Sequence, residues 1–308
     1  SEAERSLRHT CNAGRPVAVK GPAVQYAITA LKQIIRVLSD QQHHERAEEA
    51  ARQCLEINPH QHDAIEQFVA LRLAQCKWPV IAPWEGIERA TLMRGIHPLS
   101  AATYTDDPLL QLALADRSVR LSAFAAPQNP EIDRRHAAID LTCRRLRVGY
   151  VSSDLRDHAI GYLMAELFEL HRRTEVEVFA YYCGPASNSE LTQRIKASVE
   201  HWIDIRNMSD DEAARQIAAA GIDVLVDVNG HTRDSRTGIF ARRPAPVQVN
   251  WLGYPGSMAT PYHHYIIADD WIIPAGSEIY YSEKVVRLPC YQPNDRKRHV
   301  AQPLSRRE

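Results

Sequence analysis

Seven short runs of hydrophobic and β-branched residues recur along the second half of the chain. They cover residues 146–153, 176–183, 201–205, 222–229, 246–252, 263–268 and 284–288. Segments with the period of an amphipathic helix lie between some of these runs, at 162–173 and 210–220. Strands that alternate with helices in this way are typical of a parallel sheet covered by its helical crossovers. The pattern therefore predicts a Rossmann-like α/β domain over residues 145–295.

Polar turns follow three of these strands. His158 lies in the turn after the first strand, and His231 lies in an Asn-Gly-His-Thr-Arg turn at 229–233. A Gly-Tyr-Pro-Gly turn at 253–256 follows a later strand. Parallel strands end at one edge of the sheet, and ligands of open α/β sheets bind outside that edge. We therefore expect the two histidines and Tyr254 to lie along one edge and to face one cleft.

The first half of the chain is helical in character. Three apolar stripes at helical spacing run through residues 24–38, 47–57 and 64–73. The segment 47–59 resembles the second half of a tetratricopeptide repeat, although fewer than two repeats are visible and stable arrays normally need three or more. The stripes predict a small all-α, tetratricopeptide-like segment over 23–75. The alternative is an antiparallel helix pair that only packs against the core.

Changes in composition mark the remaining boundaries. Residues 1–22 are polar with several glycines and prolines, which predicts a flexible lead-in. Tryptophans and prolines interrupt the helical pattern in 76–144, which predicts a connector with one helix at 109–123. Residues 296–308 are polar and predict an interdomain linker.

Composition and charge exclude several classes of protein. The chain has 308 residues, 44% hydrophobic and 24% charged, as expected for a globular protein of about two domains. A formal net charge of −1 gives no electrostatic support for binding nucleic acid or an anionic membrane. No apolar run reaches the roughly 18 to 20 residues of a membrane span. The six cysteines lack Cys-x-x-Cys spacing, which argues against a zinc site or a disulfide framework and indicates a reduced, cytoplasmic setting.

His158 is the candidate catalytic residue. A positioned histidine exchanges protons near neutral pH, and general base catalysis contributes roughly 10²- to 10⁴-fold in rate. The positive end of the following helix favours a neutral imidazole, suited to act as a base or hydrogen-bond acceptor. The alternative is a histidine that only caps the helix beginning near Ile160.

His231 and Thr232 are candidate binding residues. Gly230 permits a tight turn, and the hydroxyl and backbone amide of Thr232 are suited to hold a sugar or a phosphate. The alternative is an ordinary surface loop. The shared sheet edge favours the functional interpretation for both histidine turns.

Other charged residues are weaker candidates. Arg242 and Arg243 are suited to bind a diphosphate, but such arginines are more often solvated or paired with carboxylates. No dinucleotide fingerprint or P-loop is present, so the sequence supports neither redox nor nucleoside triphosphatase chemistry. A Gly-x-Ser-x-Gly elbow, which carries the nucleophile of α/β-hydrolases, is also absent from the sequence.

No arrangement in the sequence favours a metal site. Asp269 and Asp270 form an acidic pair, yet neighbouring residues at a strand end point to opposite faces. His263 and His264 fail as a ligand pair for the same reason. We therefore expect no metal.

The ordered set of strands and turns resembles glycosyltransferase family 41, the protein O-linked N-acetylglucosamine transferases and the SPINDLY-type protein O-fucosyltransferases. The matching segments are 146–154 with His158, 221–227, 240–248, 251–256 and 281–289. The resemblance extends over residues 27–295.

This resemblance implies the N-terminal lobe of a two-lobed GT-B enzyme that inverts the sugar anomer without a metal or other cofactor. It implies a nucleotide-sugar donor, with UDP-N-acetylglucosamine favoured over GDP-fucose. The implied acceptor is Ser or Thr of a protein bound along the tetratricopeptide-like helices. No nucleic acid or membrane partner is implied.

The resemblance also assigns roles to the turns. His158 matches the family's active-site histidine and is expected to orient the acceptor or the donor phosphate, or to act as a base. His231 lies in a Gly-His-Thr turn that resembles the fucosyltransferase branch, since a tyrosine is usual in the animal N-acetylglucosaminyl branch. The residues expected to bind donor or acceptor, or to shape the cleft floor, are His231, Thr232, Gly253, Tyr254 and Pro255.

The family's second lobe, with its essential lysine, is expected beyond residue 305. The resemblance therefore implies a first lobe that is inactive alone and binds nucleotide sugar weakly. Two alternatives stay open: a repeat-containing interaction protein with a non-catalytic α/β lobe, and a two-lobed small-sugar enzyme such as a nucleotide-sugar epimerase.

Overall fold

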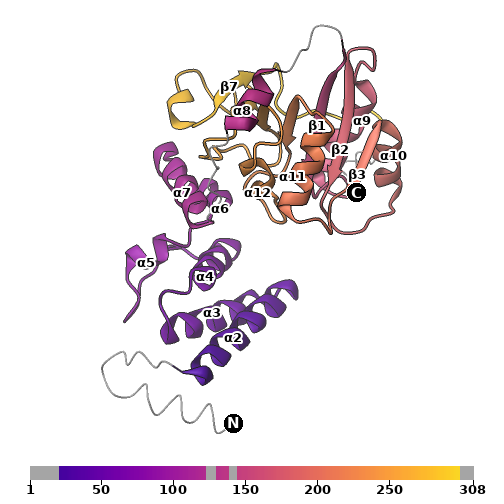
Figure 1. Ribbon diagram of the computed structural model, residues 1–308. Coiled ribbons are helices and arrows are strands. Elements are labelled where there is room, and N and C mark those ends of the chain that lie inside the picture. Colours follow the sequence, from indigo (N-terminus) through magenta and orange to yellow (C-terminus); the bar gives the residue numbers. More distant parts are fainter. Residues whose placement is uncertain (1–20, 123–129, 139–143, 299–308) are drawn as a thin grey trace, which may run out of the picture. The chain divides into compact units, whose positions relative to one another are not determined.

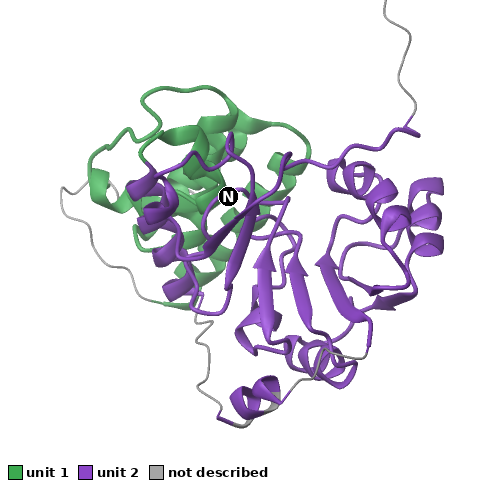
Figure 2. Ribbon diagram, turned by 90° about the horizontal axis from the view of Figure 1, so that it is seen from above, with its two compact units in different colours: residues 1–107 green, residues 108–308 purple. Residues whose placement is uncertain are grey.

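The computed structural model describes residues 21–122, 130–138 and 144–298. The chain divides into two compact units, 1–107 and 108–308, which Figure 2 shows in green and purple. The domain boundary that we expected at residue 145 therefore differs from this division, which falls within the predicted connector. Most of the lead-in expected over 1–22, and of the linker expected over 296–308, lies outside the described residues.

The first unit is built from helices packed as neighbours in sequence. Its helices are α2 (Pro22–Asp40), α3 (His44–Ile57), α4 (His62–Ala74), α5 (Arg89–Met93) and α6 (Pro98–Tyr104). Helix α3 packs against both α2 and α4 (Figure 1). Small side chains such as Ala47, Ala51 and Cys54 are fully buried on α3. Their small size lets the neighbouring helices approach closely.

The second unit holds a seven-stranded sheet. Its strands are β1 (Leu146–Ser152), β2 (Val176–Tyr182), β3 (His201–Asp204), β4 (Val224–Asp227), β5 (Val247–Asn250), β6 (Tyr265–Ala268) and β7 (Lys284–Arg287). All neighbouring strands pair in parallel, in the order β3-β2-β1-β4-β5-β6-β7. The Rossmann-like parallel sheet predicted from the sequence is therefore confirmed, with a strand at each of the seven predicted runs.

Helices cover the sheet, as alternation along the strands requires. The helices of this unit are α7 (Pro108–Leu121), α8 (Pro130–Ala137), α9 (Ala159–Leu170), α10 (Glu190–Ser198), α11 (Asp210–Ala219) and α12 (Thr237–Ala241), with a 3₁₀ turn η1 (Glu278–Tyr280). Val148 and Tyr150 of β1 pack in one core with α9 and α10. Val151 packs in a second core with α11 and α12, on the opposite face (Figure 1).

The order of the strands contains one reversal. From β1 the chain adds β2 and then β3 on one side, whereas β4 pairs with the other side of β1 and is followed by β5, β6 and β7. In open α/β sheets the loops at such a switch point diverge and leave a crevice outside the carboxyl ends of the two strands. The strand order therefore predicts a ligand site at the turns after β1 and β4.

A cluster of ion pairs fastens the segment after β7 to α9 and α10. Asp295 is almost fully buried and accepts two bonds from Arg194, at 2.6 and 3.1 Å. Arg194 also bonds to Glu169 at 2.8 Å. Arg296 donates to Glu166 through its backbone amide and its guanidinium. We call these five residues the terminal clasp.

Candidate active site

The turn after β1 leads directly into α9, and His158 is the cap of that helix. Its Nδ1 accepts a bond from the backbone amide of Ile160 at 3.3 Å. The side chain is 42% exposed, and Nδ1 lies 3.9 Å from Oδ1 of Asp154. His158 thus combines the capping alternative with an accessible ring at the carboxyl edge of the sheet.

The hydrogen bond from the backbone amide of Ile160 to Nδ1 determines which nitrogen of the His158 ring carries the hydrogen. A neutral imidazole whose Nδ1 accepts carries its hydrogen on Nε2. In this arrangement Nε2 is a hydrogen-bond donor. The sequence-based expectation of a base or acceptor therefore needs correction, because the backbone amide of Ile160 already uses the ring's acceptor nitrogen.

Asn229 joins the turns after β1 and β4. Its Nδ2 lies 2.8 Å from Oγ of Ser153, 3.0 Å from Oδ2 of Asp154 and 3.1 Å from Oγ1 of Thr232. Its Oδ1 accepts from the backbone amide of Ser153 at 2.9 Å. Asn229 is 1% exposed, so no water competes for these bonds. One buried amide therefore fixes both sides of the switch point.

His231 is buried, whereas the sequence led us to expect it on the surface of a cleft. It is 8% exposed, and its Nε2 lies 3.1 Å from the carbonyl oxygen of Met258. A carbonyl can only accept, so this nitrogen carries the hydrogen. The ring meets Tyr254 edge to face, with centroids 5.2 Å apart. Thr232, by contrast, is half-buried and keeps its hydroxyl near the switch point.

The turn after β5 fits closely against the turn after β4. A β-carbon at Gly253 would overlap the carbonyl oxygen of Val228. A β-carbon at Gly230, whose φ is +60°, would lie 2.6 Å from Cβ of Tyr254. Asn250 donates to the carbonyl oxygens of Tyr254 and of Gly256, at 3.0 and 3.1 Å. Glycine at 230 and 253 is therefore required for the close approach of these two turns.

The three turns predicted to share one edge do adjoin one another, through Asn229 and through the contact of His231 with Tyr254. Tyr254 is buried while Pro255 is exposed. Burial raises the pKa of Tyr254 well above its usual range, so its hydroxyl stays protonated. Tyr254 is therefore a buried neighbour of His231 and is not an acid or base near neutral pH.

Cysteine chemistry is disfavoured at this edge. Cys183 follows β2, and burial raises the pKa of its thiol to about 12. The thiolate, which is the nucleophilic form, is then scarce at neutral pH. Cys183 is therefore a weaker candidate nucleophile than the histidine and hydroxyl groups of the turns.

Both candidate diphosphate-binding arginines are paired with carboxylates, the alternative that the sequence analysis left open. Arg242 bonds to Asp211, and Arg243 bonds to Asp133. The acidic pair also divides as expected: Asp269 is buried and accepts from backbone amides, whereas Asp270 is exposed beside Arg287. Within the described ranges, no three His, Cys, Asp or Glu side chains come together as a possible metal site. No helix in those ranges is long and apolar enough to cross a membrane.

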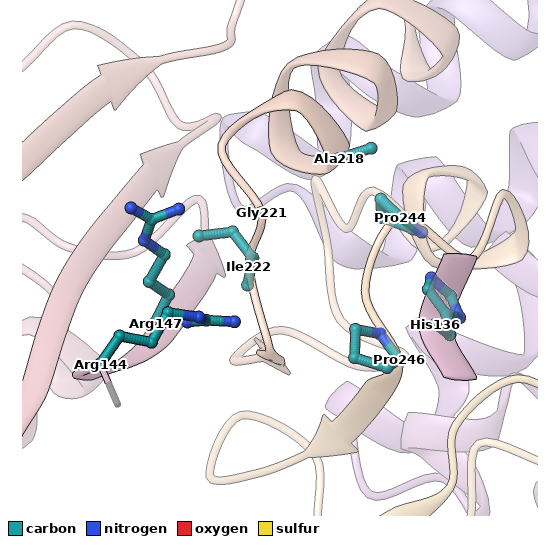
Figure 3. Close-up of a pocket in the computed structure, with 8 residues that line it drawn as sticks. All are labelled: His136, Arg144, Arg147, Ala218, Gly221, Ile222, Pro244 and Pro246. Carbon is teal, nitrogen blue, oxygen red and sulfur yellow. The ribbon is translucent and has the colours of Figure 1, made fainter. Parts of the chain in front are cut away.

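A small cavity of about 130 Å³ lies at the amino end of the sheet, away from these turns (Figure 3). Arg144 and Arg147 border it on one side, with His136 and Pro246 facing them. Arg144 is bound to Asp223 through two bonds of 2.7 and 2.6 Å. The cavity is therefore distinct from the switch-point site.

Sequence reasoning missed the residues that hold the turns together. The sequence predicts a strand and a turn at Asp227 and Asn229 but no role for their side chains, and it offers His263 only as a candidate metal ligand. The sequence does contain a usable signal, because two polar residues, Asp227 and Asn229, stand at the end of the largely apolar run 224–229. Buried polar groups need partners, so such residues mark a hydrogen-bond network.

Comparison with known proteins adds to this geometry. The sequence profile of glycosyltransferase family 41 matches residues 95–298. A probable UDP-N-acetylglucosamine–peptide N-acetylglucosaminyltransferase SEC from Arabidopsis thaliana is 36% identical over 213 residues, covering 67% of this chain and 22% of the relative. The UDP-N-acetylglucosamine–peptide N-acetylglucosaminyltransferase of Caenorhabditis elegans is 37% identical over 147 residues, covering 47% of this chain and 13% of the relative.

A probable transferase of the same description, SPINDLY from Oryza sativa subsp. japonica, is 33% identical over 159 residues, covering 49% of this chain and 17% of the relative. The chain thus spans about a fifth or less of the length of these curated relatives. Among solved structures, a variant of the Thermobaculum terrenum O-GlcNAc transferase aligns with a TM-score of 0.49 at 26% identity, covering 89% of this chain and 60% of that one.

Proposed function

The chain belongs to glycosyltransferase family 41, and from that membership we propose that it forms the first lobe of a protein O-glycosyltransferase. In this proposal a Ser or Thr hydroxyl of a protein attacks the anomeric carbon of a nucleotide sugar. The new C–O bond forms as the bond from that carbon to the diphosphate breaks, with inversion at the carbon, and the proton of the hydroxyl passes to the departing diphosphate. The donor site of a GT-B enzyme lies between two lobes, so the complete activity needs the second lobe as well.

One observation carries the proposal: the turns after β1, β4 and β5 adjoin at the switch point of the sheet, within the segment that matches the family. Buried side chains hold these turns in place before any ligand arrives. A site arranged in advance is what catalysis by positioning and hydrogen bonding requires.

Within this site we assign His158 the role of orienting a reactant. The Nε2–H of its ring is directed by the cap bond to act as a donor, which suits an oxygen of the donor phosphate or of the acceptor. Thr232 is proposed to contact the donor sugar, and Gly253 and Pro255 to border the cleft. His231 and Tyr254, being buried, are proposed to support that cleft from below.

UDP-N-acetylglucosamine is the proposed donor, because the curated relatives carry that donor in their names. GDP-fucose is the alternative, supported by the Gly-His-Thr turn at 230–232. No cofactor or metal is proposed.

We propose that the acceptor protein binds along the tetratricopeptide-like helices of the first unit. The support is the packing of α3 against its neighbours in sequence, α2 and α4. A cytoplasmic location is proposed as well, since Cys54, Cys76, Cys183 and Cys290 are all unpaired.

The test is transfer by the full-length protein. It would be incubated with radiolabelled UDP-N-acetylglucosamine or GDP-fucose and with a library of Ser- and Thr-containing peptides, and the peptides would be analysed by mass spectrometry. We expect a peptide product with one of the two donors. Conversion of the free nucleotide sugar into its epimer, without a peptide product, would instead indicate an epimerase. No turnover of either donor would favour an interaction protein.

A further inference from the structure

A chain of hydrogen bonds lies buried behind the switch point. Oγ1 of Thr260 lies 2.7 Å from Nδ1 of His263. Nε2 of the same ring lies 3.2 Å from Oδ2 of Asp227, at the end of β4. All three residues are almost fully buried. We call this series the Thr-His-Asp relay.

The direction of the relay follows from its end groups. A carboxylate oxygen only accepts, so Nε2 of His263 carries a hydrogen and donates to Asp227. In the neutral ring, Nδ1 then accepts from the hydroxyl of Thr260, which itself accepts from the backbone amide of His263 at 3.2 Å. The ring also stacks on Phe240, with centroids 5.0 Å apart. Packing and hydrogen bonds together leave the imidazole a single position.

The relay continues into the turn after β4. Oδ1 of Asp227, the oxygen that His263 does not contact, accepts from the backbone amides of Asn229 and Gly230, at 3.0 and 2.8 Å. The side chain of Asn229 then binds Ser153 and Asp154 across the switch point. Hydrogen bonds therefore run without interruption from the loop before β6 to the turn after β1.

The order of acid, imidazole and hydroxyl is also that of a hydrolase triad. Here, however, Thr260 is 3% exposed and the side chain of His263 is fully buried, so no substrate reaches either group. A nucleophilic role is excluded by this burial. What is left is an effect on the geometry of the turn that Asp227 holds.

We propose that His263 is a positioning residue for the glycosyl transfer reaction: it fixes the carboxylate of Asp227, which in turn fixes the turn 229–232 that borders the cleft. This inference rests on the proposed function. Without the Nε2–H of His263, Oδ2 of Asp227 is a buried acceptor that lacks this partner, and the carboxylate rotates or attracts water. The turn then loses its fixed position, and a shift of about 1 Å in a catalytic site costs up to roughly 100-fold in rate.

The kinetic test compares two substitutions of the same residue in the full-length protein. His263→Leu removes the donor to Asp227, and we expect turnover to fall roughly 10-fold or more, with little change in the KM for the acceptor peptide. His263→Gln keeps an N–H at the position of Nε2, and we expect it to restore most of that loss. His264→Asn is the matched control: His264 is adjacent and accepts from the amide of Gln248 at 3.0 Å, a bond that an asparagine oxygen can replace.

Hydrogen exchange tests the same inference without any substrate. We expect His263→Leu to speed exchange in the peptide that spans 227–233, while His263→Gln and His264→Asn leave it near that of the unsubstituted protein. Thr260→Val provides a second, milder interruption of the relay if His263→Leu does not fold, and it should change exchange and turnover in the same direction.

Unchanged exchange at 227–233 in both His263→Leu and Thr260→Val would overturn the inference. Faster exchange with undiminished turnover would overturn it as well, because a loosened turn would then have no effect on the reaction. If the unsubstituted protein transfers no sugar, the proposed function fails, and the positioning role for transfer fails with it. Faster exchange would in that case still establish the structural link from His263 to the turn.

Discussion

At the scale of the residue, His158 joins local structure to chemistry. The same imidazole caps α9 through Nδ1 and is partly exposed at the carboxyl edge of the sheet. His158 lies in the turn between β1 and α9, as the β-branched run and the helical segment predicted, and its part in the reaction stays a prediction. The bond to the amide of Ile160, which determines the donor nitrogen, depends on the rotamer and was beyond reach of the sequence.

Two substitutions separate these two roles of His158. We expect His158→Ala to reduce turnover roughly 100-fold and to lower the free energy of unfolding by about 1 kcal/mol through loss of the cap. His158→Asn restores a capping oxygen without a donor at the position of Nε2, so we expect stability to return while turnover stays low. Chemical denaturation and steady-state kinetics measure the two effects. Normal transfer by either variant would leave only the capping role.

Asn229 and Asp227 show the limit of inference from sequence at this scale. A polar residue at the end of an apolar strand predicts some hydrogen bond, but not which loop supplies the partner. Those partners, Ser153 and His263, are fixed only once four strands, β1, β4, β5 and β6, pair in register.

At the scale of the element, the strands were the most predictable feature. Each is a short β-branched run between polar turns, and parallel pairing with helices on both faces follows from their alternation with helical segments. The connector was less predictable, because prolines and tryptophans break periodicity. The contact of α7 with η1, far apart in sequence, explains why α7 belongs to the unit that contains the sheet.

The packing of one turn on another makes a prediction at this scale. In Gly253→Ala the added methyl group overlaps the carbonyl oxygen of Val228, which is backbone and cannot rotate away. We expect a loss of roughly 2 kcal/mol or more in the free energy of unfolding of the second unit. Gly21→Ala is a suitable control, because nothing lies within 4 Å of its added carbon. Equal thermal stability of the two variants would contradict the close approach of the turns.

At the scale of the whole molecule, the terminal clasp links residues more than a hundred positions apart. The guanidinium of Arg194 lowers the pKa of Glu169 to about 2 and also lowers the pKa of Asp295. Both folded-state values lie below those of the unfolded chain. The stabilisation is therefore complete above the pKa of an unfolded carboxyl, about 4, and is lost as the pH falls toward 2.

We expect the free energy of unfolding to decrease between about pH 5 and pH 2, and Arg194→Met to flatten that decrease. Arg172→Gln is the matched control, since Arg172 and Glu175 form a highly exposed pair that contributes little. Denaturant titrations at a series of pH values provide the measurement. An identical pH dependence in Arg194→Met and the unsubstituted protein would show that the clasp has no part in acid stability.

The turn after β4 contains an Asn-Gly dipeptide, Asn229-Gly230, which is prone to deamidation. In an Asn-Gly dipeptide the backbone nitrogen of the glycine readily attacks the side-chain amide of the asparagine, which releases ammonia and closes a succinimide ring. Water then opens this ring to aspartate or isoaspartate. In the folded chain Asp227 holds the amide nitrogen of Gly230, and Ser153 and Asp154 hold the amide of Asn229, so the attack is hindered. Each unfolding event removes that protection. Deamidation would then place a carboxylate opposite Asp154. We therefore expect ageing to damage the contact between the turns after β1 and β4 before it damages the core. Peptide mapping of heated protein measures this damage.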